Sequence, residues 1–358
     1  MRRLLPLLLA GPLLAAGAWE TVVAPPALSL PRDHGAHGSF RSEWWYVTGR
    51  LRDAAGRELG FQLTFFRQGL DPSSPEPGGS ALRARQVLAA HLALGEIGDG
   101  RMRFAQRTRR IAGGLAAASA EDLDLFLDDW EMRRAPDGTI AIEASDRDAG
   151  IGLRLELAPS RPLVLHGDHG LSRKGPGVGN ASVYLSWTRL AARGSVTLDG
   201  RTAEADGIAW FDHEWGSSQL GPGVAGWDWF GLRLADGRDL MLYRLRAADG
   251  SAAAESSGTV VAPDGTPRRL AASDFTVAAR TWWTSPRTQA RYPAVVRIAV
   301  PSAGLDLETR PLIPDSELDA VCSTGTVYWE GPVAVAGSVS GEGYVEMTGY
   351  AGSMAGRF

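Results

Sequence analysis

The chain of 358 residues is long enough for two domains, and its hydrophobic content of 44% allows a sizeable core. Its formal net charge of −4 lacks the excess of basic residues that nucleic-acid-binding proteins carry, so we expect no nucleic-acid partner. The 44 glycines and 21 prolines favour many short strands joined by turns over long helices.

The N-terminus has the pattern of a secretory signal peptide. Arg2 and Arg3 precede an uncharged run of Leu, Ala, Pro and Gly, and residues 16–18 form a small-x-small cleavage site. The run is shorter than the roughly 20 residues that a membrane-spanning helix needs, although an uncleaved anchor is the alternative. We therefore expect residues 1–18 to be removed and the mature protein to be periplasmic or secreted. Because Cys322 is the only cysteine, no intramolecular disulfide can form.

In the first half of the chain, hydrophobic residues alternate with other residues in period two, which predicts β-strands. This alternation marks the stretches 47–51, 61–65, 123–127, 151–157, 183–187 and 196–198. Glycine-containing turn signals separate them at residues 53–56, 136–138 and 198–200. A short helix is predicted only for residues 112–120.

The second half repeats the alternation. A hairpin signal at residues 235–237 joins strands predicted at 232–234 and 240–245, and further strands are predicted at 295–300, 305–307, 327–329 and 344–348. A second short helix is predicted for residues 315–321. So many evenly spaced strands are typical of barrels or sandwiches, so the expected fold class is all-β.

Half of the 12 tryptophans cluster with acidic residues and a histidine in short segments. In the strand predicted around residue 212, alternation places Asp212 and Glu214 on one face, and His213 and Trp215 on the other. Aromatic side chains around a few polar groups are typical of a ligand pocket. The ligand-binding residues predicted on this basis are Glu43, Trp44, Trp45, Tyr46, His91, Glu214, Trp227 and Trp229.

Acid–base chemistry on an apolar substrate is the functional hypothesis for these segments. Burial in an apolar pocket raises the pKa of a carboxylic acid, which can then protonate a carbon–carbon double bond. A tryptophan face can stabilise the resulting carbocation. The alternative is a buried structural network at one end of a barrel, in which the acids pair with Arg41, Arg233 or Arg244.

Metal binding and nucleophilic hydrolysis have weaker support. His34 and His37 have the spacing of a turn chelate, but no zinc-type motif surrounds them, so no metal and no cofactor is expected. The chain has no Gly-x-Ser-x-Gly elbow, and Cys322 has no histidine near it in the sequence. The sequence therefore offers no nucleophile for a hydrolase.

Three long motifs resemble the carotenoid 1,2-hydratase-like (hydroxyneurosporene synthase-like) secreted proteins, and the resemblance spans nearly all of the mature chain. The motifs occupy residues 42–67, 210–230 and 328–350. The resemblance implies two lipocalin-like antiparallel β-barrel domains packed together, which we place at residues 30–218 and 219–358. It also implies relatives that hydrate carotenoids or cyclise polyenes, and others that are called predicted hydrolases and are found beside export transporters.

The resemblance further implies a His-x-Trp pair and a Tyr/Asp pair at the reaction site. His213 and Trp215 match the first pair, whereas Tyr243 matches the tyrosine but is followed two residues later by Leu245 instead of an acid. Other acids must then replace it, and Asp239 is one of those considered. The predicted catalytic residues are His213, Trp215, Asp212, Asp228 and Tyr243, of which His213 and Trp215 are preferred.

These observations predict an exported protein that binds an apolar, unsaturated lipid or isoprenoid ligand and hydrates or isomerises it. The alternative function is a non-catalytic periplasmic lipid carrier or an accessory factor of an export transporter. The expected partners are a hydrophobic small molecule, an export transporter complex and, by peripheral contact, a membrane.

Overall fold

The computed structural model describes residues 18–72, 84–217, 220–221 and 223–355. The predicted signal peptide therefore lies outside the described residues, apart from Ala18. The described chain is built almost entirely from antiparallel strands in two large sheets, together with one small two-stranded sheet and three short 3-10 helices. The predicted all-β fold with two lipocalin-like units is confirmed.

The first sheet contains every strand from Ser42 to Gly216. Its strands are β1 (Ser42–Asp53), β2 (Glu58–Gly69), β3 (Gln86–Glu96), β4 (Arg103–Arg110), β5 (Ala116–Ala118), β6 (Asp124–Leu127), β7 (Trp130–Arg134), β8 (Ile140–Asp146), β9 (Ile151–Pro159), β10 (Val164–Leu165), β11 (Leu171–Arg173), β12 (Ala181–Leu198) and β13 (Arg201–Gly216). They are ordered β4-β3-β2-β1-β13-β12-β9-β8-β7-β6-β5, and β10 and β11 pair with β12. A 3-10 helix, η1 (Arg32–His34), precedes them.

The second sheet begins at Val224 and ends at Thr348. Its strands are β14 (Val224–Leu234), β15 (Asp239–Ala247), β16 (Ser257–Val261), β17 (Pro267–Ala271), β18 (Thr276–Ala279), β21 (Val296–Val300), β22 (Leu305–Pro311), β23 (Glu317–Ala320), β24 (Thr326–Gly337) and β25 (Gly341–Thr348). Their order is β17-β16-β15-β14-β25-β24-β22-β21-β18, and β23 pairs with β24. The remaining elements are η2 (Ala272–Asp274), η3 (Pro301–Ala303) and the small sheet of β19 (Trp282–Thr284) and β20 (Arg291–Pro293).

Both predicted short helices are wrong. Residues 112–120 contain Gly113 and Gly114 with positive φ angles of 69° and 77°, which interrupt a helix, and the alanines after them form β5 against β6. Within 315–321, Leu318 and Ala320 are buried on either side of the exposed Asp319, which is strand periodicity, and β24 supplies the backbone partners. Tertiary pairing thus overrides the local helical propensity.

Alternation along the strands divides the buried side chains into three main clusters. One fills the interior of the first sheet and includes Phe61, Leu63 and Phe65, and a second fills the interior of the second sheet. A third cluster lies between the sheets and is mainly aromatic. Its buried members are Tyr46, Tyr184, Trp210, Val224, Trp229, Met241, Tyr243, Leu245 and Tyr344.

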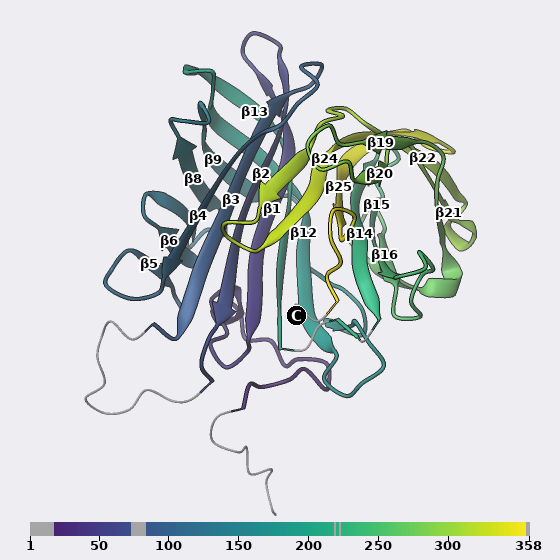
Figure 1. Cartoon of the computed structure of the whole chain (residues 1–358), viewed down its shortest axis with the longest axis horizontal. Helices are drawn as coiled ribbons and strands as arrows, with labels where there is room; N and C mark the ends of the chain where they lie inside the picture. The colour runs from purple at the N-terminus through teal and green to yellow at the C-terminus, as the bar shows by residue number, and fades with distance from the viewer. Residues whose placement is uncertain (1–17, 73–83, 218–219, 222, 356–358) are drawn as a thin grey trace, which may run out of the picture.

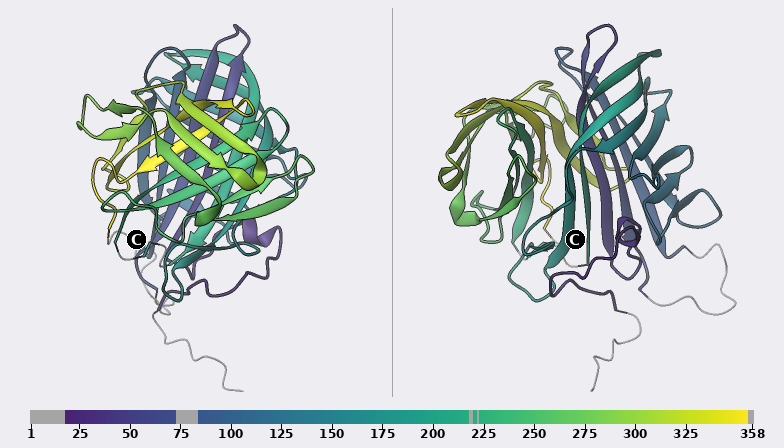
Figure 2. Two further views of the ribbon diagram at one scale, coloured as in Figure 1. Left: turned by 90° about the vertical axis from the view of Figure 1, so that its right-hand side faces the viewer. Right: turned by 180° about the vertical axis from the view of Figure 1, so that it is seen from behind.

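The two sheets lie side by side, with the first curled into a half-barrel and the second into a near-closed barrel (Figure 1). Strands β24 and β25 of the second sheet contact β2 and β1 of the first, and β14 contacts β12. The two views of Figure 2 show the strands of the second unit crossing the outer face of the first sheet obliquely. No helix among the described residues is long and apolar enough to cross a membrane.

Candidate functional site

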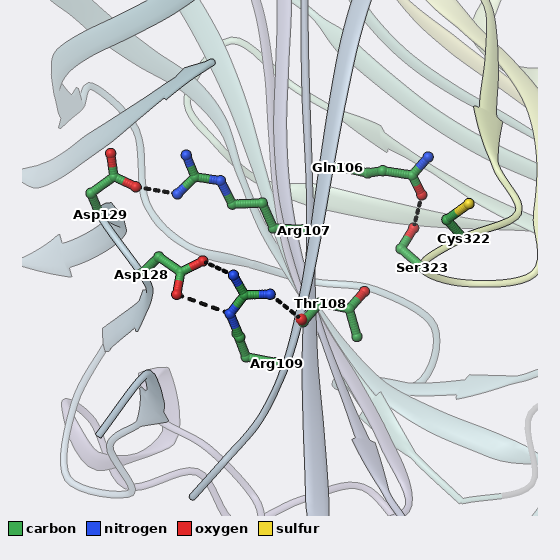
Figure 3. A pocket seen from close by; sticks show the side chains of 8 residues that line it. All are labelled: Gln106, Arg107, Thr108, Arg109, Asp128, Asp129, Cys322 and Ser323. Carbon is green, nitrogen blue, oxygen red and sulfur yellow. Dashed lines mark hydrogen bonds and ion pairs between the residues drawn. The ribbon is translucent and has the colours of Figure 1, made fainter. Parts of the chain in front are cut away.

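A cavity of about 430 Å³ lies between the two sheets. Its walls come from β1, β2, β3, β12 and β13 on one side and from β14, β15, β24 and β25 on the other. Their surface is mainly apolar, with charged and polar groups among aromatic side chains. This volume and composition are typical of a site for a small organic ligand. A second hollow of about 470 Å³ opens widely on the surface beside β4 and is lined by charged and polar side chains (Figure 3).

The alternation predicted around residue 212 is present in β13, and it decides which residues reach the cavity. Asp212 and Glu214 line it. Their register partners on the neighbouring strand β1, Tyr46 and Trp44, line it as well. His213 lies on the opposite face of the strand, inside the first barrel. Of the other predicted ligand-binding and catalytic residues, those that line the cavity are Glu43, His91, Trp227, Trp229 and Tyr243, whereas Trp45, Trp215 and Asp228 do not.

His213 and Trp215 belong to a closed network inside the first barrel. His213 Nε2 lies 2.8 Å from Glu43 Oε1, and the His213 ring stacks on Trp45 at 4.9 Å between ring centroids. Trp215 stacks on His37 at 3.8 Å, and His37 Nδ1 lies 2.7 Å from the same Glu43 oxygen. Although Glu43 borders the cavity, its side chain is fully buried. We interpret this network as the support behind the cavity wall.

The same network offers the ligand atoms for a metal ion. Among the described residues, His37, Glu43 and His213 bring three such atoms within 4.8 Å of one another. However, the guanidinium of Arg67 donates to Glu43 Oε2 at 2.8 Å. Despite burial, the hydrogen bonds from His213 and His37, followed by the charge of Arg67, hold the pKa of Glu43 well below its usual range. Since Arg67 already supplies the positive charge that a metal ion would bring, these residues fit an ion-pair network better than a metal site.

Asp212 accepts three side-chain hydrogen bonds at the cavity wall. Trp210 Nε1 donates to its Oδ1 at 2.6 Å, Tyr184 donates to its Oδ2 at 2.7 Å, and Ser186 also donates to Oδ1. Burial nevertheless outweighs these donors and raises the pKa of Asp212 to about 7. Asp212 therefore changes its charge near neutral pH.

Tyr184 also accepts a hydrogen bond from Trp229 Nε1 at 2.9 Å, which fixes the position of that indole in the cavity wall. The Trp229 ring passes so close to Gly231 that a Cβ there would lie 2.4 Å from it. A glycine at this position is therefore required for the Trp229 orientation.

Glu214, the other β13 acid on the cavity, is neutralised locally. The Lys174 ammonium lies 2.9 Å from its Oε1 and 3.8 Å from the centre of the Tyr243 ring. Tyr243 in turn donates its hydroxyl hydrogen to the Arg173 carbonyl oxygen at 2.8 Å. Glu214 and Lys174 thus form one charged pair at the wall, and Tyr243 contributes its ring face.

Two acids that the sequence analysis did not single out share the cavity. Glu330 of β24 and Glu346 of β25 are directly opposed in register and both line it. Tyr46 donates to Glu330 Oε1 at 2.5 Å, and Trp227 Nε1 donates to Glu346 Oε1 at 3.0 Å. Burial and the neighbouring Glu346 carboxyl raise the pKa of Glu330 well above its usual range, and burial raises the pKa of Glu346 to about 7. No basic side chain among the described residues forms an ion pair with either acid.

A sequence signal for these two acids exists. Alternation in β24 puts Tyr328 and Glu330 on one face and Trp329 on the other, where Trp329 fills the second barrel. A glutamate in a strand whose two faces are both buried is uncommon, so it is itself a marker of a site. The sequence alone, however, does not show that this face meets a second sheet.

The other predicted acids are tied into ion pairs. Asp228 pairs with Arg246 at 3.0 Å and with Arg244 at 3.3 Å, on the face of β14 opposite Trp227 and Trp229. Asp239 accepts hydrogen bonds from Arg161, Arg189 and Thr188 across the boundary between the sheets. Both carboxylates are fully satisfied, which leaves them structural roles. Arg233, one of the bases proposed to pair with the β13 acids, pairs with Glu342 instead.

Comparison with known proteins places this architecture among solved structures. A structure from Nitrosomonas europaea assigned to AttH is similar over 94% of this chain and 100% of its own, with a TM-score of 0.83 and 36% sequence identity. The kievitone hydratase of Nectria haematococca has the same fold over 94% of this chain and 96% of its own, with a TM-score of 0.67 and 14% identity. No curated protein sequence matches the chain significantly.

The family model for AttH-like proteins matches residues 21–350, which is nearly the whole described chain. The narrower resemblance to carotenoid 1,2-hydratases remains a prediction. On the extent of the family match and the identity to the Nitrosomonas structure, this chain belongs to the AttH-like family.

Proposed function

We propose that the cavity binds an apolar, unsaturated small molecule of the lipid or isoprenoid class and that Glu330 and Glu346 hydrate or isomerise it. The observation that carries this proposal is the opposed pair of buried carboxyl groups in a cavity with a mainly apolar surface, where neither carboxyl forms an ion pair with a base. Two such groups cannot both ionise cheaply, so one keeps its proton while the other titrates. That division provides one acid and one base.

In the proposed reaction, the Glu330 O–H bond breaks and a C–H bond forms at one carbon of the double bond. The faces of Trp229 and Trp227 stabilise the carbocation. In a hydration, water adds its oxygen to the cation and the Glu346 carboxylate takes the proton that the water loses. In an isomerisation, Glu346 takes a proton from the neighbouring carbon instead. Transfer of one proton from Glu346 back to Glu330 restores the starting state in either case.

The structural comparison agrees with this chemistry at the level of the fold. A protein named as a hydratase, kievitone hydratase, shares the two-unit architecture with this chain. Its low sequence identity of 14% supports a common fold alone, so the reaction proposed here rests on Glu330, Glu346 and the cavity. The resemblance to carotenoid 1,2-hydratases points to the same class, with isoprenoids as the ligands.

Hydration is tested by incubating the protein with isoprenoid alkenes and unsaturated fatty acids in ¹⁸O-labelled water. We expect mass spectrometry to find one ¹⁸O atom in a hydrated product of at least one compound, and at least about a hundredfold less of this product with Glu330→Gln. Double-bond migration is followed in the same samples by chromatography. Absence of both products for every compound that binds would refute the catalytic part of the proposal.

Binding without catalysis is the second candidate function. Tyr243 matches the tyrosine of the family's Tyr/Asp pair, but the acid near it, Glu214, is already paired with Lys174. Tyr243 therefore has no free acid beside it to act with. In that case the protein carries a lipid in the periplasm, to which the N-terminal sequence would direct it, and serves an export transporter or a membrane surface. Lipid extraction of protein purified from its native host then yields a stoichiometric apolar compound that is recovered unchanged. A protein that contains no such compound and binds none would contradict the carrier function.

The variant His213→Phe tests whether the two faces of β13 have different roles. The phenyl ring keeps the stacking on Trp45 but removes one hydrogen bond to the Glu43 carboxylate, so unfolding should become easier by about 1.5–3 kcal/mol. Because His213 lies behind the cavity wall, ligand affinity measured by tryptophan fluorescence should stay unchanged. A variant of normal stability that no longer binds ligand would show that His213 itself contacts the ligand.

A further inference from the structure

One side chain borders both hollows of the molecule. Ser323 lies in the turn between β23 and β24, and it lines both the cavity between the sheets and the surface hollow beside β4. In the surface hollow it is hydrogen-bonded to Gln106, as Figure 3 shows. The two spaces are thus separated by a single layer of side chains at this point.

A continuous hydrogen-bonded chain leads inward from Ser323. Its Oγ lies 2.6 Å from Gln106 Oε1 and 2.8 Å from His91 Nε2, and His91 Nδ1 lies 2.7 Å from the Tyr328 hydroxyl. Tyr328 lines the cavity two residues before Glu330, on the same face of β24. The chain therefore starts at the surface hollow and ends at Tyr328, on the cavity face of β24 that also carries Glu330.

The hydrogen positions in this chain follow from its outer end. Gln106 Nε2 donates to the Asp319 carbonyl oxygen at 2.7 Å, so Gln106 presents its oxygen to Ser323 and must accept the serine hydrogen. Ser323 Oγ then accepts from His91 Nε2–H, and His91 Nδ1 accepts from Tyr328 O–H. His91 is fully buried, and burial lowers its pKa to about 3, so the ring is neutral and carries a single hydrogen.

The same contacts argue against a nucleophilic serine. A Ser–His pair of this spacing would be a nucleophile if the serine donated its hydrogen to the imidazole. Here the Ser323 hydrogen points to Gln106, and His91 Nε2 is the donor. The third member, Tyr328, is a donor to His91 instead of the carboxylate acceptor of a catalytic triad.

We propose that Ser323, His91 and Tyr328 form a proton relay between the surface hollow and the acid pair Glu330 and Glu346. The relay rests on the proposed function, since the acid pair is the group that it serves. It gives the acids a route to solvent through side chains of the cavity wall. The residues act as relay residues and need not touch the ligand.

Each transfer is balanced. For an outward proton, the Tyr328 O–H bond breaks as an N–H bond forms at His91 Nδ1. The His91 Nε2–H bond then breaks as an O–H bond forms at Ser323 Oγ. The original hydroxyl hydrogen of Ser323 passes to the solvent in the surface hollow. Tyr328 regains a hydrogen from the acid pair. The inward transfer reverses every step and starts from the other tautomer of the neutral imidazole, which the outward transfer leaves with its hydrogen on Nδ1.

The relay is tested without any substrate, by laser release of a caged proton and time-resolved infrared detection of Glu346 protonation. The Glu346 band is assigned by its loss in Glu346→Gln. His91→Phe, which packs beside Phe66 and Phe104, and Ser323→Ala should each slow this protonation by about tenfold or more, with the equilibrium midpoint unchanged. Ser323→Thr keeps the hydroxyl and should restore the rate.

Val321→Ala is the matched control and should keep the wild-type rate, because Val321 lies exposed in the same turn, lines neither hollow and is outside the chain of hydrogen bonds. Wild-type protonation rates in both His91→Phe and Ser323→Ala, with folded protein shown by thermal melting, would overturn the relay and leave the proposed reaction standing. Labelling of Ser323 by a fluorophosphonate would also overturn it. If the proposed reaction is wrong but the relay is right, the pattern is the opposite: protonation of Glu346 is slowed in the variants, and no ligand gives a product.

Discussion

Glu330→Gln should reduce the rate of ligand hydration or isomerisation by about 10²–10⁴-fold, the usual contribution of a general acid. The amide has nearly the same shape and can still accept the hydrogen bond from Tyr46, so the cavity should keep its form and ligand affinity should change little. The loss is therefore expected in kcat and not in Kd. Product quantification in reactions quenched at set times gives kcat, and fluorescence titration of the same proteins gives Kd.

Glu308→Gln is the control for this change. Glu308 belongs to β22, which pairs with β24 in the same sheet, but it lies at the surface beside Arg310 and outside the cavity. Wild-type turnover is expected for it. Equal losses in both variants would mean that the effect comes from the sheet as a whole, and an active Glu330→Gln would remove Glu330 from the reaction.

Asp212→Asn should change how the stability of the protein depends on pH. The pKa of Asp212 is about 7 in the folded protein and about 4 in an unfolded chain, so between these values only the folded state holds the proton. The stabilising contribution of Asp212 is then complete below about pH 4 and is lost as the pH rises through about 7. At about 1.4 kcal/mol per pKa unit, the total loss is about 4 kcal/mol.

The asparagine variant lacks this loss. Its free energy of unfolding, relative to that of the wild type, should therefore rise by about 4 kcal/mol between pH 4 and pH 8. Urea denaturation across this range measures the difference, and the titrations of the buried histidines cancel because both proteins contain them. A difference that does not vary with pH would show that Asp212 has an ordinary pKa and is ionised throughout.

Much of the fold could be predicted because many of its strands alternate in hydrophobicity and are separated by turn signals. The hairpin at residues 235–237 joins β14 and β15 as expected, and the Trp-rich segments lie in β1, β13 and β14. The prediction failed where composition was ambiguous: an alanine-rich stretch became β5, and two predicted strands merged into β12 across a bulge between Trp187 and Leu190. Only the neighbouring strands decide such cases.

The site was harder to predict than the fold. Alternation separated Asp212 and Glu214 from His213 and Trp215, but a β-sheet buried on both faces gives no indication of which face holds a ligand. The second sheet decides this, because β24 and β25 cover the face that carries Asp212 and add Glu330 and Glu346. The partners Tyr46 and Glu330 are 284 positions apart, and His91 and Ser323 are 232 apart, so no local pattern connects them.

The presence of a neutral carboxylic acid in the cavity is the central claim, and infrared difference spectroscopy at pH 7 tests it most directly. The spectrum of the wild type minus that of Glu330→Gln should show the C=O stretch of a protonated carboxyl group, and the band should shift when an apolar ligand fills the cavity. A carboxylate band at pH 7 in the same difference spectrum, unaffected by ligand, would contradict the account.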